Sequence, residues 1–317
     1  MYLHTTFRPS WLVTLISLLM SYHNETRQID YPPTGMMTKT KIIEWLNKSA
    51  SLLAERSELA SLEARVILCH VLDKSREWLV THPDFELDNL QIDQANQMIG
   101  RILIGEPLPY LVGKQAFFGL DFKVTPDVLI PRPETELLIE ECITWLEEHP
   151  TKRKLADIGT GSGSIAITLA DRFEDLQVTA IDISEKALNV ARQNAELIKN
   201  KTQIEFIQND LLENCSDRFD VIAANLPYIP SEKLKSLAVS RHEPILALDG
   251  GIDGLDLIKR LLQQSRNNLK PGGMIILEIE EGQSESVQNL VDKLLPGVEK
   301  SILIDLANHP RILKIMV

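Results

Sequence analysis

The chain has 317 residues, which is about two domains' worth, because single hydrophobic cores rarely grow past ~250 residues. Its hydrophobic fraction of 44% and charged fraction of 25% exclude a collagenous, coiled-coil or wholly disordered chain. The net charge of −12 argues against a protein that binds mainly by neutralising nucleic-acid phosphates. The three cysteines form no C-x-x-C pair, so we expect reduced thiols in a cytoplasmic compartment rather than disulfides or a zinc site.

Residues 1–35 differ in character from the rest of the chain. Their apolar run, Trp11–Met20, is shorter than the roughly 17–25 residues that a bilayer requires, and no small-residue cleavage site follows it. Met36 and Met37 stand directly before a well-patterned amphipathic segment. We therefore expect the functional protein to begin there, with residues 1–35 as an upstream extension or a disordered tail.

Residues 36–106 carry apolar side chains at helical spacing. Three stripes are visible: Ile42, Ile43, Leu46, Leu52 and Leu53; Leu62, Val66, Ile67, Val71 and Leu72; and Ile92, Ala95, Met98, Ile102 and Leu103. Ser75 is expected to cap a short helix, and Gly105 to end a longer one. The pattern predicts a small helical bundle without a cluster of chemically active side chains. A packing role and a partner-recognition role fit this pattern equally well.

Residues 107–130 change to aromatics, glycines and two-residue alternation, which is typical of a β-hairpin. We expect this segment to link two domains. Residues 131–136 (PRPETE) then form a rigid entry to a helix that begins near Leu137.

From Lys154 onward, short apolar strands alternate with helical stretches. The expected strands are Leu155–Ile158, Val178–Ile183, Ile204–Ile207, Val221–Ala224, Met274–Ile279, Ser301–Leu306 and Ile312–Val317. This alternation predicts an α/β domain over 131–317, with a doubly wound, Rossmann-like parallel sheet covered on both faces. Only 307–311 separate the last two strands, so the final strand is expected to run antiparallel.

A glycine loop, Gly159-Thr160-Gly161-Ser162-Gly163, follows the first of these strands and opens a helix. Glycines let a backbone turn sharply and approach a ligand, while a helix N-terminus offers free N–H groups. Ser164 stands where the dinucleotide fingerprint requires glycine, and Asp157 precedes the loop. A tight strand-to-helix turn without a ligand remains an alternative.

Two further acidic positions end the next strands. Asp182 is placed to accept both hydroxyls of a ribose, as in doubly wound nucleotide sites; the alternative role of helix N-cap fits Ser184 better. Asp210 and Leu211 follow the third strand, where they would face an adenine amino group and cover its ring. Aspartate at a strand end is also ordinary turn chemistry.

The tetrapeptide Asn225-Leu226-Pro227-Tyr228 follows the fourth strand, outside whose carboxyl end ligands of open α/β sheets bind. The Asn225 side-chain oxygen and the Leu226 carbonyl each accept one N–H bond, and Tyr228 offers a face for stacking. The tetrapeptide therefore has the parts needed to hold a planar –NH2 group. A simple Asn-x-Pro turn is the alternative.

The order of DIGTGSG at 157–163, Asp182 and NLPY at 225–228 resembles the S-adenosylmethionine-dependent class I methyltransferases that act on amino or amide nitrogen. The flanks are similar to the peptide chain release factor glutamine N5-methyltransferases of the PrmC/HemK type. They comprise Pro107-x-x-Tyr110-x-x-Gly113, Phe117-Phe118-Gly119, the segment 129–136, Arg241-x-Glu243-Pro244 and Leu248-Asp249-Gly250-Gly251. This resemblance covers about 37–317.

The resemblance implies that S-adenosylmethionine is bound by these residues: Asp157, Gly159, Thr160, Gly161, Ser162, Gly163, Asp182, Asp210, Leu211 and Asn225. It implies that residues 225–228 hold the substrate and carry catalysis. The substrate would be the glutamine of the Gly-Gly-Gln motif in release factors, gripped by the helical domain. Release factors are thus the expected partner, with no metal, no stable nucleic-acid partner and no membrane.

Two departures from the family pattern stand out. Leu226 replaces the first proline of Asn-Pro-Pro-Tyr, and Glu280 stands where glycine is expected. Asn-Leu-Pro-Tyr is also familiar in rRNA adenine dimethyltransferases, so adenine-amino methylation of RNA or DNA is the alternative. The charge favours a protein substrate, because 36–105 carry 8 basic and 10 acidic residues and 106–317 carry 23 and 33. A nicotinamide oxidoreductase, disfavoured by Ser164, and a non-catalytic binding module complete the alternatives.

Overall fold

The structure, a computed structural model, describes residues 39–199 and 204–317, and the leader expected at 1–35 lies outside this range. The chain divides into two compact units between Val112 and Gly113. This division falls six residues after the boundary expected between 106 and 107. Each unit has its own hydrophobic core.

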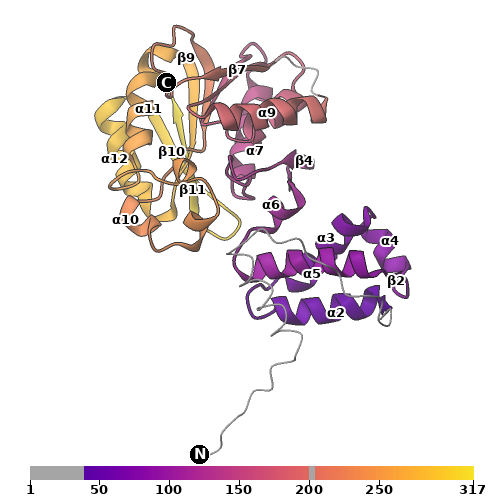
Figure 1. The fold of residues 1–317 in the computed structure, drawn as a ribbon. Helices are drawn as coiled ribbons and strands as arrows, with labels where there is room; N and C mark the ends of the chain where they lie inside the picture. The colour runs from indigo at the N-terminus through magenta and orange to yellow at the C-terminus, as the bar shows by residue number, and fades with distance from the viewer. Residues whose placement is uncertain (1–38, 200–203) are drawn as a thin grey trace, which may run out of the picture. The chain divides into compact units, whose positions relative to one another are not determined.

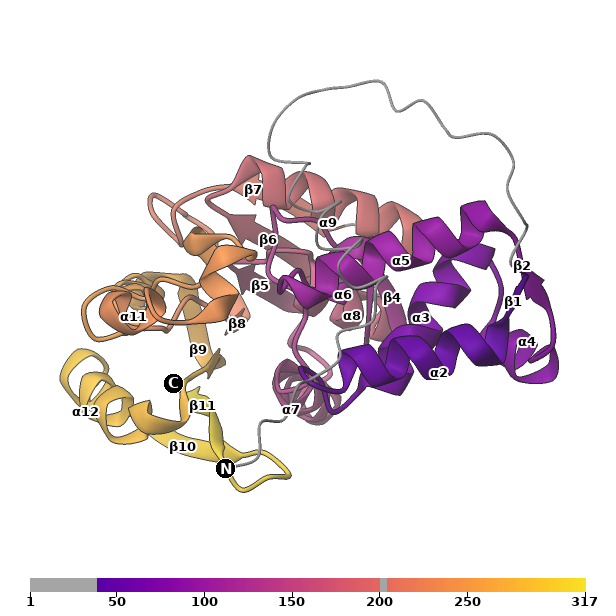
Figure 2. The same ribbon diagram turned by 60° about the horizontal axis from the view of Figure 1, so that its bottom comes forward.

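The first unit is a helical bundle, which confirms the helical domain expected from the three apolar stripes (Figure 2). Its helices are α2 (Ile42–Leu53), α3 (Ala60–Leu72), α4 (Arg76–Thr81), α5 (Asn89–Leu103) and α6 (Leu108–Val112), with short strands β1 (Thr40–Lys41) and β2 (Glu86–Leu87). Its core includes Ile42, Trp45, Ile67 and Leu68. Ser75 caps α4 as expected, because its hydroxyl accepts the Trp78 N–H at 3.2 Å.

The expected hairpin is present but shorter than 107–130, with strands β3 (Lys114–Phe117) and β4 (Leu120–Lys123). The turn between them uses Phe118 and Gly119 at positive φ. Phe117 and Phe122 are buried in the core of the second unit, their rings 6.0 Å apart and edge to face. The hairpin is therefore a structural part of the second unit.

The second unit is built on a seven-stranded sheet in the order β10-β11-β9-β8-β5-β6-β7. Its strands are β5 (Lys154–Ile158), β6 (Gln177–Asp182), β7 (Ile204–Gln208), β8 (Phe219–Ala224), β9 (Leu269–Glu278), β10 (Glu299–Ile304) and β11 (Pro310–Met316). Strands β5 to β9 are mutually parallel, whereas β11 is antiparallel to both β9 and β10. The α/β fold and its antiparallel last strand are thus confirmed.

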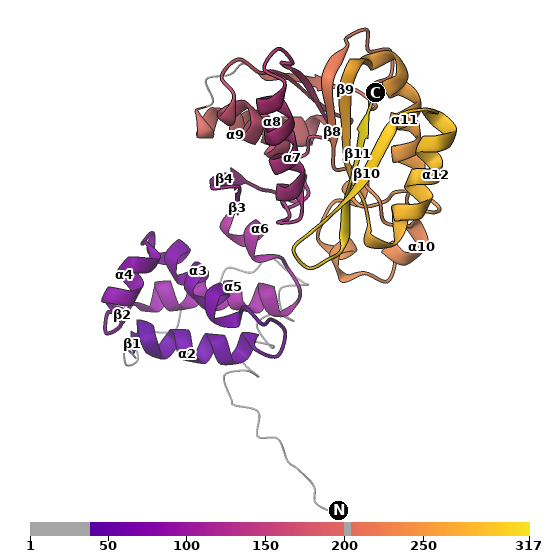
Figure 3. The same ribbon diagram turned by 180° about the vertical axis from the view of Figure 1, so that it is seen from behind.

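Helices cover both faces of this sheet (Figures 1 and 3). One face packs against α7 (Thr135–Glu148), α8 (Ser164–Arg172) and α9 (Glu185–Ile198), and the other against α11 (Asp256–Asn268) and α12 (Ser284–Leu294). Short turns complete the unit: α10 (Ser231–Leu234), η1 (Ala238–Arg241), η2 (Ile245–Ala247) and η3 (Glu281–Gln283). Strand β8 is fully buried, as a central parallel strand with helices on both sides should be. Over 39–199 and 204–317, no helix is long and apolar enough to cross a membrane.

Candidate functional site

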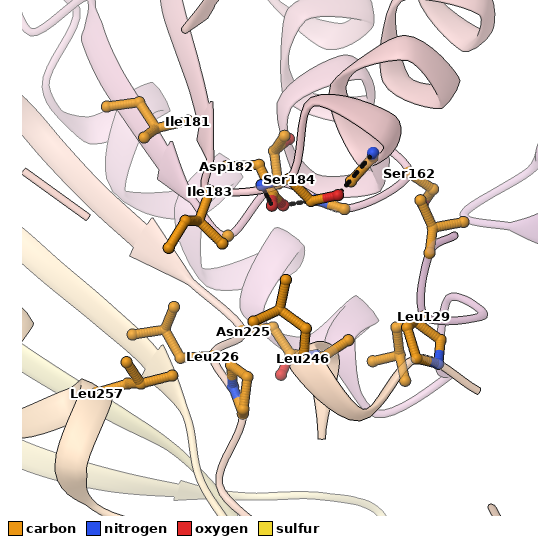
Figure 4. Close-up of a pocket in the computed structure, with 18 of the residues that line it drawn as sticks. Leu129, Ser162, Ile181, Asp182, Ile183, Ser184, Asn225, Leu226, Leu246 and Leu257 are labelled. Carbon is orange, nitrogen blue, oxygen red and sulfur yellow. Dashed lines mark hydrogen bonds between the residues drawn. The ribbon is translucent and has the colours of Figure 1, made fainter. Parts of the chain in front are cut away.

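A cavity of about 750 Å³ opens at the carboxyl ends of β5, β6 and β8 (Figure 4). Most of the residues expected to form a site line it: Gly159, Thr160, Gly161, Ser162, Asp182, Asp210, Leu211, Asn225, Leu226 and Pro227. Asp157, Gly163 and Tyr228 lie outside its wall. The sheet topology explains the convergence, since parallel neighbours end at the same edge.

The glycine loop turns back on itself through three left-handed residues, Gly159, Gly161 and Gly163. The backbone N–H groups of Gly159 and Thr160 both donate to the Ile181 carbonyl of the neighbouring strand, at 2.8 and 3.0 Å. A Cβ at Gly159 would lie 3.0 Å from the Leu226 side chain. The loop therefore sits directly against the Asn225–Tyr228 segment, and side chains there would separate the two.

Asp157 is fully buried beneath the glycine loop. Its Oδ2 accepts the Thr160 hydroxyl at 2.6 Å and the Ala166 N–H at 3.1 Å, which ties the loop to the first turn of α8. Its Oδ1 is buried and has no partner among the described residues. Burial raises the pKa of this carboxyl to about 7, against the opposing effect of the two hydrogen bonds.

Asp182 stands at the end of β6, and each of its oxygens accepts one backbone N–H. Oδ2 accepts from Gly161 and Oδ1 from Ser184, both at 2.9 Å. Each oxygen keeps further lone pairs for a ligand in the cavity. Burial raises the pKa of Asp182, and the N–H donors oppose that shift. Ser184 is the N-cap of α9, accepting the Ala187 N–H, as the sequence indicated.

Asp210 and Leu211 follow β7. One oxygen of Asp210, Oδ2, forms an ion pair with Arg260 at 2.8 Å, a partner on α11 that the sequence did not reveal. Leu211 has a φ of +54° and is buried against the cavity. Ile183, half exposed directly after Asp182, adds another apolar wall that sequence reasoning missed (Figure 4).

Asn225 has its side-chain amide fixed by two acceptors. Its Nδ2 donates to the Thr135 hydroxyl at 3.0 Å and to Glu278 Oε2 at 2.9 Å. The Asn225 Oδ1 and the Leu226 carbonyl receive no hydrogen bond from the described part of the chain. Both carbonyl oxygens are thus available as acceptors at the cavity wall, where Asn225 and Leu226 stand (Figure 4).

The backbone after Leu226 is clamped by a second loop. A Cβ at Gly250 would lie 2.8 Å from the Pro227 carbonyl, and one at Gly254 would collide with the Tyr228 carbonyl. Gln283 Nε2 donates to the Tyr228 carbonyl at 3.0 Å. These contacts hold the tetrapeptide in place although Leu226 stands where the family has its first proline.

Tyr228 does not line the cavity. Its hydroxyl donates to Glu278 Oε1 at 3.2 Å, and burial, followed by this carboxylate, raises the pKa of the tyrosine. Its stacking on a flat substrate group stays a prediction. Gly163 also lies outside the cavity wall, where it is the N-cap of α8.

Thr135 and Glu278 are the main residues that sequence reasoning missed. Glu278 ends β9 with a side chain 3% exposed, and burial raises its pKa while the Thr135 and Tyr228 hydrogen bonds oppose that shift. A carboxylate directly after the buried apolar run 274–277 was the available signal, because buried acids are rare unless they are paired.

An ion pair between two motifs far apart in the sequence, with Glu243 buried and Arg132 partly exposed, joins the rim of the cavity. Arg132 contacts Glu243 Oε1 at 2.5 Å, and the Ile130 N–H donates to Glu243 Oε2 at 3.2 Å. Pro244 then leads into η2, whose Leu246 is exposed at the cavity (Figure 4). The segments 129–136 and 241–244 therefore form one edge of the site.

Comparison with known proteins agrees with this geometry. Residues 44–113 match the PrmC N-terminal domain family, and residues 134–242 match the methyltransferase small domain family. A release factor glutamine methyltransferase of Bacillus cereus is 36% identical over 280 residues, which are 86% of this chain and 97% of that protein. The chain belongs to the release factor glutamine methyltransferase family.

Other members of the family align with similar shares of this chain. The Moorella thermoacetica protein of the same description is 39% identical over 82% of this chain and 92% of its own length. The Koribacter versatilis protein of the same description is 40% identical over 73% of this chain and 82% of its own length. The family resemblance drawn from the motifs is therefore confirmed.

Glu280, a departure from the family pattern, has an ordinary backbone, with φ −72° and ψ 145°. Its N–H donates to Gln283 Oε1 at 3.0 Å, and its carboxylate pairs with Lys233. The local backbone thus has no need of glycine here.

Proposed function

We propose that this protein transfers a methyl group from S-adenosylmethionine to the side-chain amide nitrogen of the glutamine in the Gly-Gly-Gln motif of release factors. The observation that carries this proposal is the fixed amide of Asn225. With Nδ2 bound to Thr135 and Glu278, the Asn225 Oδ1 and the Leu226 carbonyl form a pair of acceptors suited to the two N–H groups of a primary amide.

The residues of the cavity fit S-adenosylmethionine, which supplies an electrophilic methyl group when it is bound. Asp182 has lone pairs left for the two ribose hydroxyls, and the glycine loop exposes its backbone to the ligand. Leu211 and Asp210 would contact the adenine from the other side. Beneath the loop, Asp157 accepts the Thr160 hydroxyl and the Ala166 N–H and so holds the glycine loop against the start of α8.

A carboxamide nitrogen is a weak nucleophile because its lone pair is delocalised into the carbonyl. The task of the protein is therefore to hold this nitrogen in place. Fixing two reactants at close distance contributes up to roughly 7–11 kcal/mol in favourable systems. As positive charge develops on the nitrogen, its N–H groups become better donors, and the Asn225 and Leu226 oxygens stabilise this state more than the ground state.

The substrate is proposed to be a protein for reasons of charge as well as family. Neither 36–105, with 8 basic and 10 acidic residues, nor 106–317, with 23 and 33, has the cationic excess that a phosphate backbone favours. In this proposal the helical unit binds the release factor and residues 113–317 carry the chemistry, in the cytoplasm.

The test is to incubate the purified chain with labelled S-adenosylmethionine and a bacterial-type release factor. Mass spectrometry of the Gly-Gly-Gln peptide should show one added methyl group. A release factor with Ala in place of that glutamine is the matched control and should take up no label. Transfer to ribosomal RNA with no transfer to the release factor would overturn the proposal in favour of adenine methylation.

A further inference from the structure

A closed ring of hydrogen bonds joins Thr135 and Asn225, at the cavity wall, to Glu278 behind them. Thr135, at the start of α7, donates its hydroxyl proton to Glu278 Oε2 at 2.6 Å. Asn225 Nδ2 donates to that same Oε2 at 2.9 Å and to the Thr135 oxygen at 3.0 Å. The Tyr228 hydroxyl donates to the other oxygen of Glu278 at 3.2 Å. Three donors therefore converge on one carboxylate.

This ring determines which end of the Asn225 amide faces Thr135 and Glu278. An asparagine side chain has nearly the same shape in its two amide orientations, so hydrogen bonding alone decides which atom faces which neighbour. An ionised carboxylate only accepts, and Thr135 has already given its single proton to Glu278. Both neighbours thus require the –NH2 end of Asn225, and its oxygen is turned away from them.

The opposite orientation is costly. It would place Asn225 Oδ1 against Glu278 Oε2 in a site where Glu278 is only 3% exposed. Two hydrogen bonds, one of them to a charged group, would be lost, and a buried charge would be left short of donors. Each such loss costs about 1–3 kcal/mol, which is enough to exclude the flipped state almost completely.

We propose that Glu278, assisted by Thr135, is a positioning residue that fixes the orientation of Asn225 and thereby makes the cavity wall an acceptor of N–H groups. The inference deepens the proposed function and rests on it. The orientation of Asn225 also determines which substrate group can bind. With the amide flipped, the Asn225 –NH2 would face the –NH2 of the substrate, two donors would meet, and the primary amide would be rejected.

Two substitutions at Glu278 separate hydrogen bonding from packing. Glu278→Leu removes the acceptor, and we expect turnover to fall about 100-fold while the Kd for S-adenosylmethionine, measured by calorimetry, changes less than threefold. Glu278→Gln keeps one carbonyl oxygen for Thr135 and Asn225 and turns its –NH2 to the Tyr228 oxygen. We therefore expect Glu278→Gln to restore turnover to within about tenfold of wild type.

The chain offers a matched threonine pair as a second test, should Glu278→Leu not fold. Thr168 is also buried, yet its hydroxyl has no partner among the described residues. Thr135→Val is expected to lower kcat at least tenfold with little change in the KM for S-adenosylmethionine, whereas Thr168→Val should leave both unchanged. Thermal denaturation of both variants shows whether they fold.

A double substitution tests the orientation itself. Asn225→Asp places a second carboxylate beside Glu278, and their repulsion should leave this variant inactive. Adding Glu278→Gln removes the repulsion and supplies an –NH2 donor to the new carboxylate, so the double variant should regain at least tenfold in turnover. If wild type methylates the release factor but Glu278→Leu and Thr135→Val turn over like wild type, or the double variant gains nothing, this inference is wrong. If wild type itself does not methylate the release factor, the proposed function fails instead.

Discussion

Two loops at the same edge of the sheet are held by opposite means. The glycine loop at 159–163 is fixed by its own backbone and by nearby carboxylates, Asp157 from the preceding strand and Asp182 from the next. The loop at 225–228 is fixed by side chains far away in the sequence: Thr135 lies 90 positions from Asn225, and Glu278 lies 53. The first loop is held by partners within one β-α-β unit, residues 157–182, whereas the second is held by partners that meet only when distant parts of the sheet are assembled.

This contrast predicts that substitutions in the two loops have different effects. Damage to the glycine side should appear as weaker cofactor binding or lower stability. Damage to the Asn225 side should appear as lost turnover with the cofactor still bound. The following predictions test this separation.

Removing the amide of Asn225 should have the largest effect. Asn225→Ala deletes the proposed acceptor and leaves the buried Glu278 without one donor, so we expect turnover to fall roughly 100- to 1,000-fold, in line with the loss of one transition-state hydrogen bond of this kind. The Kd for S-adenosylmethionine should stay within a few-fold, as measured by calorimetry. Asn189→Ala, on the exposed face of α9, is the control. Wild-type turnover in Asn225→Ala would contradict the assignment.

Asp157 should make stability depend on pH. Burial, the largest cause, raises its pKa from 3.8 to about 7, so the folded state holds a proton that the unfolded state has already lost. Stability from this group is present below about pH 4 and is lost as pH rises to about 7. The unfolding free energy of the cofactor-free protein should fall, relative to Asp157→Asn, by up to about 4 kcal/mol across that window. Urea titrations at several pH values measure this difference, and parallel curves for the two proteins would refute it.

Removing the Asp182 carboxylate should weaken cofactor binding and leave the rate of methyl transfer almost unchanged. Asp182→Ala deletes the proposed ribose acceptor and the anchor of the Gly161 N–H, and hydrogen bonds to charged groups contribute about 1.5–3 kcal/mol. The Kd for S-adenosylmethionine should rise about 10–100-fold, with kcat at saturation within a few-fold. Asp175→Ala, which removes an exposed carboxylate paired with Arg153, is the control. Unchanged affinity in Asp182→Ala would exclude the ribose role.

The same contrast explains how far the sequence could be interpreted. The strand positions, the glycine loop and the antiparallel end depend on local periodicity, and the structure confirms them to within a few residues, apart from the longer β9. The role of Glu278 depends on which side chains the fold brings to the end of β9. No pattern within residues 269–278 states that Thr135 and Asn225 will meet there.

The hairpin is a second case in which a local sequence pattern did not predict a contact with a distant part of the chain. Its alternating pattern predicted two strands, which are present. The pattern did not show that Phe117 and Phe122 insert into the core of the second unit, because burial depends on the surface that the hairpin meets. The ion pair between Arg132 and Glu243 was missed for the same reason, being formed across 111 positions.

Two glycines of the same loop should differ in their tolerance of a methyl group. Gly163→Ala combines a φ of +83° with a Cβ placed 3.2 Å from Ala191 and 2.7 Å from the end of Ile167. Gly161→Ala has a φ of +55° and meets only a carbonyl at 3.9 Å. A left-handed alanine costs about 1–2 kcal/mol, so Gly161→Ala should lose about 1 kcal/mol of unfolding free energy and Gly163→Ala about 2. Equal losses in urea denaturation would show that packing against α9 contributes nothing.

Restoring the family glycine at position 280 should have the smallest effect. Glu280→Gly removes the ion pair with Lys233, which is partly exposed and so stabilises by no more than about 1 kcal/mol. The backbone N–H that binds Gln283 is kept, and with it the link from Gln283 to the Tyr228 carbonyl. We expect the unfolding free energy to change by about 1 kcal/mol or less and turnover to stay within twofold, with Lys233→Ala as the matched control. A tenfold loss of turnover in Glu280→Gly alone would mean that the Glu280 side chain, and not only the backbone there, holds the Asn225 loop in its active position.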